Sequence, residues 1–461
     1  MSESTYAHFI GIGGAGMSGI ALVLKARGVR VTGSDLRESR YTHALVRAGI
    51  DVAIGHDAAN LGTPEVVVVS SAIPDSNPEL TEAHRRGLPI WQRAQMLAHL
   101  AEDRRTVAVA GTHGKTTTSS MVATMLSGMG LEPTFLIGGE VCAFGTNAVA
   151  GSGDHYVVEA DESDGSFMHL DPDVLLITNI EADHLDHYGT LAKVEETFAA
   201  FMGKVKRDGT LVVCRDDERL VEMAGDVPCS VLTYGHHAEA DVRITTAQRY
   251  GLGYRSRISL PELEVEISTS FPGLHNVANA AGALAVAHAL HLDPDAAAKA
   301  LSEFGGVKRR FERVGEVADV TVVDDYAHHP TEVAATLHAA RDLGFRRVWA
   351  VFQPHRFTRT AALANEFGSA FGEADRVVLL DVYSAGETPI PGVSGRTILD
   401  TVLRQYPRAA LAWLPHRADV VRYLVSNVGA GDLVLTIGAG DVTTLGPEII
   451  RGITAASEAR C

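Results

Sequence analysis

The sequence predicts an α/β fold that is divided into three domains. Short apolar runs alternate with helix-like segments from end to end, which is the rhythm of parallel sheets built from strand–helix–strand units. The chain has 461 residues, and roughly 150 residues per domain suggests three domains. Its 45 glycines against 17 prolines suit many strand-to-helix turns. We place the domains at residues 1–94, 95–305 and 306–461.

The first domain is predicted to be Rossmann-like, because a short strand runs into a glycine fingerprint and then a helix. In "FIGIGGAGMSGIALVL" the pattern G-x-G-x-x-G falls on Gly11, Gly13 and Gly16, and Asp35 closes the next strand. Such glycines let the backbone approach a diphosphate at a helix N-terminus. The fingerprint fits NAD and a UDP-sugar equally, and a tight turn without ligand is the less favoured interpretation. We also assign Gly14, Ser70 and Ser71 to this site.

The second domain carries a phosphate-binding loop (P-loop) in "VAVAGTHGKTTTSSM". A short strand, 107–110, is followed by a glycine turn and by helical spacing over 116–129. Val109 stands where the usual G-x-x-x-x-G-K-[ST] pattern has a glycine, so the loop is shorter. Lys115 can neutralise phosphate charge, and the Thr116 hydroxyl can bind Mg²⁺. The predicted ATP-binding residues here are Gly111, Thr112, His113, Gly114, Lys115, Thr116 and Thr117. A glycine turn with a surface lysine is the competing interpretation.

Two further strands of this domain end in acidic and imidazole side chains. Glu159 closes an apolar run, and we predict that it binds Mg²⁺ because it adjoins a buried strand. We expect the other acids of that loop to be solvated or to support the site; they are Asp161, Glu162 and Asp164. The segment "TNIEADHLDHYG" contains Asp183, His184, Asp186 and His187. One histidine and one carboxylate there could hold a second divalent ion or position a γ-phosphate, and a structural histidine is equally possible.

The third domain is also predicted to be Rossmann-like, with four strands that each end in a polar loop. Because the carboxyl ends of parallel strands share one edge, these loops should face a common ligand. "DDYAHHP" contains Asp325, Tyr326, His328 and His329 before a helix that starts at Pro330. "QPHRFTRT" contains His355, Arg356 and Arg359. Since arginine grips carboxylate and phosphate in a bidentate way, the two loops predict a site for an acidic substrate, with basic solvated turns as the alternative.

Composition excludes several classes of function. A formal charge of −17 argues against broad binding to nucleic acid or to an anionic membrane. The four cysteines form no C-x-x-C pair, so neither a disulfide framework nor a thiolate zinc site is indicated. Neither a signal peptide nor a run of about 18 apolar residues is evident. We therefore expect a reduced, cytoplasmic protein, monomeric or dimeric, without membrane or nucleic-acid partners.

The order of the motifs resembles the Mur ligases of bacterial peptidoglycan synthesis. The stretches that carry the resemblance are "FIGIGGAGMSGIA", "GTHGKTTT", "EADESD", "TNIEADHLD", "GLHNVANA", "GVKRRFE", "DDYAHHP" and "QPHRFTRT", and they cover nearly the whole chain. Within the family the pattern is most similar to the branch that joins L-alanine to UDP-N-acetylmuramate. The resemblance implies that the first domain binds the UDP-substrate, the second binds ATP with one or two Mg²⁺ ions, and the third admits the amino acid.

The resemblance also implies a role for individual residues. Lys115 would contact the transferring phosphate, Thr116 and Glu159 would hold Mg²⁺, and His184 would bind the second metal ion. His275 and Asn276 would contact the adenine, and Asp325 would contact the nucleotide. The group around the substrate carboxylates and phosphates would be Tyr326, His328, Arg356 and Arg359. Of these residues, those expected to take part in catalysis are Lys115, His184, His328 and Arg356.

One departure from the family pattern supports this branch. Several Mur ligases have a carbamylated lysine about 14 or 15 residues after the metal-binding histidine, whereas this chain has Phe198 and Ala199 there. The alanine-adding branch lacks that lysine. The alternatives are a ligase that recycles murein tripeptide onto the same UDP-sugar, an NAD-dependent oxidoreductase, and a nucleotide-binding switch without catalysis. The oxidoreductase gives no role to Lys115 and Glu159, and the switch gives no role to the polar loops of the third domain.

Overall fold

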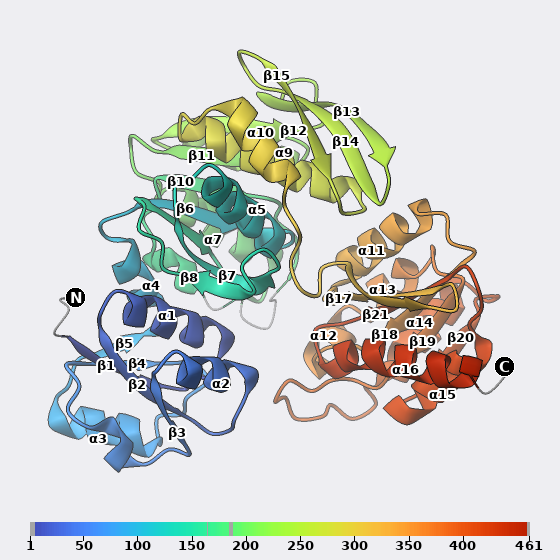
Figure 1. Ribbon diagram of the computed structural model, residues 1–461, viewed down its shortest axis with the longest axis horizontal. Helices are drawn as coiled ribbons and strands as arrows, with labels where there is room; N and C mark the ends of the chain where they lie inside the picture. The colour runs from blue at the N-terminus through green and yellow to red at the C-terminus, as the bar shows by residue number, and fades with distance from the viewer. Residues whose placement is uncertain (1–4, 164, 184–187, 459–461) are drawn as a thin grey trace. The chain divides into compact units, whose positions relative to one another are not determined.

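The computed structural model describes residues 5–163, 165–183 and 188–458, and it is an α/β structure built on three sheets (Figure 1). The chain divides into two compact units. The first holds the first sheet and the core of the second, and the other holds the third sheet, from Gly306 onward, with two short stretches at 247–255 and 268–277. Among the described residues, no helix is long and apolar enough to cross a membrane. The predicted domain boundaries stay a prediction.

The first sheet has the strand order β3-β2-β1-β4-β5, and all its pairs are parallel. Its strands are β1 Tyr6–Ile10, β2 Arg30–Asp35, β3 Asp51–Ile54, β4 Val66–Val69 and β5 Ile90–Gln92. Its helices are α1 Ala15–Ala26, α2 Arg40–Arg47, α3 Pro78–Arg86 and α4 Arg93–Ala101, with a short 3-10 turn η1 at Ala58–Leu61. One face packs its apolar side chains on α1, and the opposite face packs on α3. This arrangement confirms the Rossmann-like prediction.

The second sheet is ten-stranded, in the order β15-β14-β13-β12-β11-β10-β6-β9-β7-β8. Its strands are β6 Arg105–Ala110, β7 Thr134–Val141, β8 Thr146–Val149, β9 His155–Glu159, β10 Val174–Ile177, β11 Thr210–Cys214, β12 Ser230–Gly235, β13 Val242–Tyr250, β14 Gly253–Ser259 and β15 Glu264–Thr269. Its helices include α5 Lys115–Gly128, α7 Leu191–Met202, α8 Glu218–Met223, α9 Leu274–Ala289 and α10 Pro294–Ser302. Strand β6 lies between β10 and β9, and both pairings are parallel. The ends of these three strands therefore meet at one edge.

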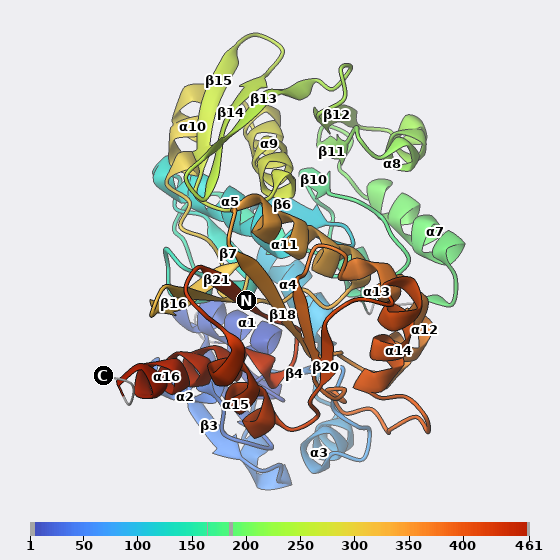
Figure 2. The same cartoon turned by 90° about the vertical axis from the view of Figure 1, so that its right-hand side faces the viewer.

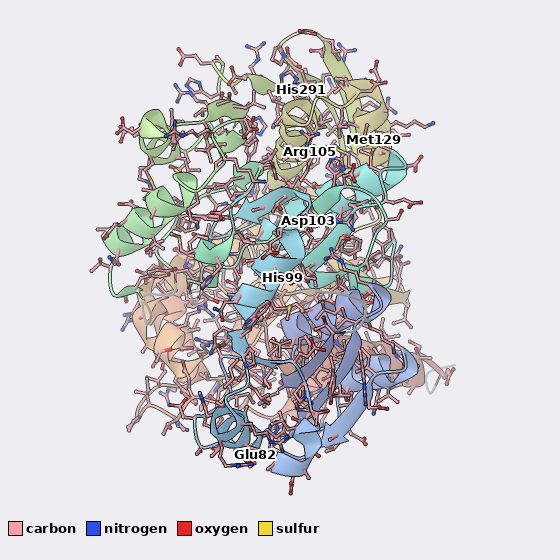
Figure 3. The ribbon with its side chains drawn as sticks, turned by 90° about the vertical axis from the view of Figure 1, so that its left-hand side faces the viewer. Glu82, His99, Asp103, Arg105, Met129 and His291 are labelled. Atoms are coloured by element: carbon pink, nitrogen blue, oxygen red, sulfur yellow. The ribbon has the colours of Figure 1, made fainter. Side chains whose placement is uncertain are left out.

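The first two sheets are joined through α4 and packed through α1. Figure 3 shows the connection, with His99 on α4, Asp103 in the turn and Arg105 at the start of β6. Helix α1 packs against β7 and β8 so closely that a Cβ atom on Gly19 would lie 2.8 Å from Leu136. The amide of Asn147 donates to the Ala15 carbonyl at 3.2 Å. The helix of the glycine fingerprint thus belongs to the same core as the sheet that carries the P-loop.

The third sheet has the order β16-β17-β21-β18-β19-β20, and only β16 runs antiparallel to its neighbour. In Figure 2, strands β18 and β20 of this sheet lie between helices α13 and α14 on one side and α15 and α16 on the other. Its strands are β16 Glu312–Val317, β17 Val320–Asp325, β18 Arg347–Phe352, β19 Arg376–Leu379, β20 Leu411–Trp413 and β21 Asp432–Ile437. Its helices are α11 Pro330–Asp342, α12 Phe357–Ala362, α13 Ala364–Ala370, α14 Gly395–Gln405, α15 Arg417–Asn427 and α16 Leu445–Glu458. Helices α11, α13 and α14 cover one face, and α15 and α16 cover the other. The predicted shared edge of four polar loops is confirmed, because β17, β21, β18 and β19 are adjacent and parallel.

Candidate functional site

The P-loop joins β6 to α5 and depends on glycine at two positions. Gly111 has a φ of +124°, and a Cβ atom there would lie 2.1 Å from the Thr178 hydroxyl oxygen. Gly114 has a φ of +83° and directly precedes the helix. Both values lie where L side chains are strained, so these glycines are required by the backbone. Val109 is a buried strand residue that pairs with Glu159 of β9, which explains why no glycine is needed there.

The segment after β10 fixes the P-loop from the side. The Asn179 carbonyl accepts from the Thr112 amide at 2.9 Å, and the Asn179 side-chain oxygen accepts from the His113 amide at 2.9 Å. The Thr178 hydroxyl donates to the His113 carbonyl at 2.6 Å. Sequence reasoning missed Asn179, although its position directly after a buried strand, in the same polar loop as His184, was a usable signal.

Lys115 points back over its own loop. Its ammonium donates to the Gly111 carbonyl at 2.6 Å, to the Thr112 carbonyl at 3.2 Å and to Glu162 Oε1 at 2.8 Å. Burial lowers the pKa of Lys115, but the carboxylates of Glu162 and Asp161 outweigh burial and leave that pKa above its usual value. The lysine is therefore a partly buried cation held at the anion-binding end of α5.

Glu159 and Thr116 form an oxygen-rich corner next to the lysine. The Thr116 hydroxyl donates to Glu159 Oε1 at 2.8 Å, and the Gly138 amide donates to Glu159 Oε2 at 2.6 Å. Burial raises the pKa of Glu159 above its usual value. A partly buried carboxylate beside a hydroxyl is the hard oxygen set that Mg²⁺ prefers, and a cation there would offset the cost of removing the charge from water. The donor set fits a magnesium ion.

Two roles were predicted for Glu162, a solvated one and a supporting one, and its position agrees with the supporting one. Glu162 is only 2% exposed, and it forms an ion pair with Lys115. Burial raises the pKa of Glu162 to about 7. The turn places Glu162 inward, whereas Asp161 is only partly buried and accepts from the Ser163 amide at 3.0 Å. Four predicted positions lie outside the described residues: Asp164, His184, Asp186 and His187.

The two positions expected for the missing lysine differ in burial. Phe198 on α7 is fully buried, and its ring lies 5.6 Å from that of Phe167. A charged side chain at position 198 would need a polar partner that the aromatic cluster does not offer. Ala199 is exposed, so packing excludes a lysine at position 198 but not at position 199.

The glycine fingerprint of the first sheet brings its predicted residues together. Gly11 has a φ of +80°, and a Cβ atom there would lie 3.2 Å from Ser70. The Gly13 amide donates to Asp35 Oδ2 at 2.8 Å, so the acid that closes β2 braces the loop. Gly16 lies against the side chain of Arg93, which sequence reasoning missed. Gly14 caps α1, and Ser71 lies exposed in the turn after β4.

The loops after β17, β18 and β19 assemble a row of aromatic and imidazole rings. The ring centroids of Tyr326 and His328 are 5.4 Å apart, and those of His328 and His355 are 5.8 Å apart. His355 stacks on Tyr383 at 5.7 Å with 10° between the planes. Burial, followed by His328 and nearby arginines, lowers the pKa of His355 to about 3, so its imidazole is neutral. Sequence reasoning missed Tyr383, which follows a buried strand in the same way as the others.

The two predicted arginines lie beside this row. Arg356 is the residue before α12 and has a φ of +67°, a left-handed conformation that is rare outside glycine. Its amide donates to the Tyr383 carbonyl at 2.9 Å. Arg359, one turn into α12, lies 3.5 Å from His355 Nδ1. The predicted grouping of Tyr326, His328, Arg356 and Arg359 at one edge is thus present.

The residues proposed to contact the nucleotide from outside the P-loop lie at the end of β17 and in the first turn of α9. Asp325 is the last residue of β17 and not part of the following loop; its Oδ1 accepts from the Ala327 amide at 2.8 Å and its Oδ2 from the Phe311 amide at 2.8 Å. Burial raises the pKa of Asp325 to about 6. His275 is the second residue of α9, and it is exposed. The Asn276 amide group donates to the Pro272 carbonyl at 2.7 Å.

Comparisons with known proteins cover all three parts of the chain. Residues 6–105 match the model of the Mur ligase family, catalytic domain; residues 109–287 match the Mur ligase middle domain; and residues 309–440 match the Mur ligase, glutamate ligase domain. The UDP-N-acetylmuramate–L-alanine ligase of Rubrobacter xylanophilus is 48% identical over 96% of this chain and 99% of its own length. The chain belongs to the Mur ligase family.

Other relatives agree with this membership. The UDP-N-acetylmuramate–L-alanine ligase of Pelotomaculum thermopropionicum is 46% identical over 98% of each chain. The crystal structure of the UDP-N-acetylmuramate–alanine ligase MurC of Thermotoga maritima superposes with a TM-score of 0.82 at 29% identity, over 98% of this chain and 99% of that one. A murein peptide ligase of Psychrobacter arcticus gives a TM-score of 0.73 at 26% identity, over the same shares. The family resemblance seen in the motifs is confirmed.

Proposed function

We propose that this Mur ligase joins L-alanine to the lactyl carboxylate of UDP-N-acetylmuramate in peptidoglycan precursor synthesis, with conversion of ATP to ADP and phosphate. The observation that carries the reaction class is the convergence of Lys115, Thr116 and Glu159 at one strand edge. The named substrates come from relatives that are 46–48% identical over almost the full chain. We assign the first domain to the UDP-substrate, the second to ATP and the third to the amino acid.

In the proposed reaction the lactyl carboxylate attacks the γ-phosphate of ATP, giving an acyl phosphate and ADP. Phosphoryl transfer of this kind is mostly positioning and charge neutralisation. Lys115 leaves Glu162 and its loop carbonyls to pair with the transferring phosphate, while the amides at the start of α5 bind the phosphate chain. The amine of L-alanine then attacks the acyl carbon, and phosphate leaves from a tetrahedral intermediate.

Thr116 and Glu159 are the described residues that would hold a magnesium ion, and His184 is proposed for a second one. When bound, the ion supplies neutralisation of the phosphate oxygens. Glu159 is kept in place by the Gly138 amide, so the chain itself fixes where that charge lies. Asp325, His275 and Asn276 are proposed to contact the nucleotide, and Tyr326, His328, Arg356 and Arg359 to contact the substrate carboxylates.

A phosphate-release panel tests this proposal. The purified protein is mixed with ATP, Mg²⁺ and UDP-N-acetylmuramate, and then with L-alanine, glycine, L-serine or murein tripeptide as the amine. We expect release only when both the UDP-sugar and an amine are present, with L-alanine preferred. A preference for the tripeptide would favour the recycling alternative, and release that is indifferent to the sugar would refute the ligase.

A further inference from the structure

Two clusters, each with an arginine paired to a buried aspartate, lie at opposite ends of strand β21. At the amino end, Asp432 is fully buried and accepts from Arg347 Nη2 at 2.6 Å and from the Trp349 indole at 3.0 Å. At the carboxyl end, Asp324 of β17 is 2% exposed and accepts from Arg309 Nε at 3.2 Å. Both arginines also lie over an aromatic ring, Arg347 at 5.3 Å from Trp349 and Arg309 at 4.8 Å from Tyr326.

The two clusters differ in the backbone carbonyls that the arginine binds in addition to its aspartate. Arg309 Nη2 donates to the Gly438 carbonyl at 2.6 Å and to the Gly440 carbonyl at 3.1 Å, while its Nη1 lies 3.4 Å from the Ala439 carbonyl. One guanidinium therefore binds three successive carbonyls of the loop that follows β21. Arg347 reaches only the Asn427 carbonyl beyond its aspartate, at the end of the sheet without the polar loops.

Asp324 holds the Arg309 guanidinium in place through its own hydrogen bonds. Its Oδ1 accepts from the Thr436 hydroxyl at 2.6 Å, and its Oδ2 accepts from the Thr443 hydroxyl at 2.7 Å. Strand β17 pairs with β21 in a register that sets Asp324 opposite Thr436. With Arg309 added, the carboxylate is fully partnered, so the guanidinium has a fixed point from which to hold the loop.

The 438–440 loop and the row of rings from Tyr326 to Tyr383 are joined at both ends, so that they form one closed series of contacts. The Arg309 carbonyl accepts from the Tyr326 amide at 2.7 Å, and its guanidinium supports the Tyr326 ring. At the other end, a Cβ atom on Gly440 would lie 2.7 Å from the Tyr383 ring, so that ring rests on the loop. The circuit passes through Arg309, Tyr326, His328, His355, Tyr383 and Gly440.

The backbone of Arg309 is itself held in an uncommon conformation. Its φ is +62°, in the left-handed region, which is strained for a residue with a side chain. The Glu312 carboxylate accepts from the Arg309 amide at 2.9 Å and stabilises this turn. The conformation aims the side chain at the 438–440 loop, and it persists because the surroundings determine it fully.

We propose that Arg309 is a positioning residue for the amino-acid substrate. It touches no substrate; it holds Tyr326 and the 438–440 loop so that the row from Tyr326 to Tyr383 keeps a fixed shape. This inference rests on the proposed function, which places the amino acid at these loops. A single methyl group gives only about 10–200-fold discrimination in a pocket, so selection of L-alanine over glycine depends on a rigid wall.

The test compares Arg309→Lys with Arg347→Lys, which remove the same planar fork from the two ends of β21. We expect Arg309→Lys to raise the KM for L-alanine about tenfold and to lower the kcat/KM preference for L-alanine over glycine. Its KM values for ATP and UDP-N-acetylmuramate should stay within about twofold of the original. We expect Arg347→Lys to lower the melting temperature without changing any of the three KM values.

Three results would overturn the inference. They are an unchanged KM for L-alanine in Arg309→Lys, an equal rise in all three KM values, or the same KM shift in Arg347→Lys. If Arg309→Lys does not fold, Thr443→Val removes one hydrogen bond to Asp324 and should raise the same KM by a smaller factor; no rise there also contradicts the inference. A lack of L-alanine-dependent phosphate release in the unmodified chain would overturn the proposed function itself, and the inference with it.

Discussion

Two glycine loops of the first unit, after β1 and after β6, each have a buried charged cluster beside them, and the clusters behave in opposite ways. Next to the β1 loop, Glu79 is fully buried and its Oε2 accepts from His8 at 3.0 Å and from Ser34 at 2.6 Å. Its Oε1 accepts from the Asp57 amide at 3.1 Å and from Asn60 at 3.0 Å. Next to the β6 loop, Lys115 is surrounded by Glu159, Asp161 and Glu162.

The pKa shifts separate the two clusters. Burial tends to raise the pKa of Glu79, but hydrogen bonds from His8, Ser34 and Asn60 overcome it and lower the pKa to about 2. Burial raises the pKa of Glu159 and takes that of Glu162 to about 7, because its effect outweighs the hydrogen bonds and the lysine charge that lower these pKa values. A fully partnered charge stabilises a fold, whereas poorly compensated buried acids beside a lysine are typical of a site that receives a cation and an anion.

The largest expected effect is at the lysine. Lys115→Ala should lower ligase turnover by about a thousandfold, because the charge that meets the transferring phosphate is gone. UDP-N-acetylmuramate binding, measured by calorimetry, should be unchanged. Lys206→Ala is the control, since Lys206 forms a surface ion pair with Asp173 at 2.9 Å and should leave turnover unaltered. Near-normal turnover in Lys115→Ala would refute the phosphate role.

Glu79→Gln should cost about 3 kcal/mol of unfolding free energy at pH 7, because it breaks a buried, fully bonded charge cluster. The pKa of Glu79 is lowered in the fold from 4.5 to about 2, so its contribution is present above pH 4.5 and is lost as pH falls toward 2. Urea unfolding between pH 7 and pH 2 measures this. If the unmodified chain and Glu79→Gln lose unfolding free energy in parallel below pH 4.5, Glu79 is not the group that causes the loss.

Glu159→Gln should lower turnover about a hundredfold and raise the Mg²⁺ concentration needed for half-maximal activity. The amide oxygen can still accept from Thr116 but carries no charge for the ion. A magnesium titration of phosphate release measures the shift. Glu196→Gln is the control, because the Glu196 side chain is 69% exposed. An unchanged titration would contradict the assignment of Glu159 as a metal ligand.

Gly13→Ala should have the smallest effect, a rise of about tenfold in the KM for UDP-N-acetylmuramate with no change in the KM for ATP. The added Cβ atom would lie 2.8 Å from both Asp35 Oδ2 and Thr42 Cγ2, and so would disturb the first loop alone. Gly225→Ala is the control, because a Cβ atom there meets nothing within 4 Å. A rise in the KM for ATP instead would mean that the two loops are not separate in function.

Local patterns were enough to predict the strands, the loops and several partners. The helix predicted over 116–129 spans Lys115–Gly128, and Pro330 begins α11 as its position indicated. Val109, which stood in place of a glycine, belongs to β6 and faces Glu159 across the strand pair. Glycine spacing and strand ends depend on residues close in sequence, so they can be read from the chain alone.

Contacts made by side chains that fold back could not be predicted in this way. The burial of Glu162 depends on a turn that directs one acid of a cluster inward. The reach of Arg309 to the carbonyls of 438–440 joins residues about 130 positions apart, and no local pattern encodes it. Asn179 is bonded to the P-loop only because β10 lies beside β6.

The decisive experiment is phosphate release from ATP by the unmodified chain, with UDP-N-acetylmuramate and L-alanine each added or withheld. We expect sustained release only when both are present, together with a product whose mass is that of the UDP-sugar plus one alanine residue. Equal release without the sugar or without the amino acid would contradict it.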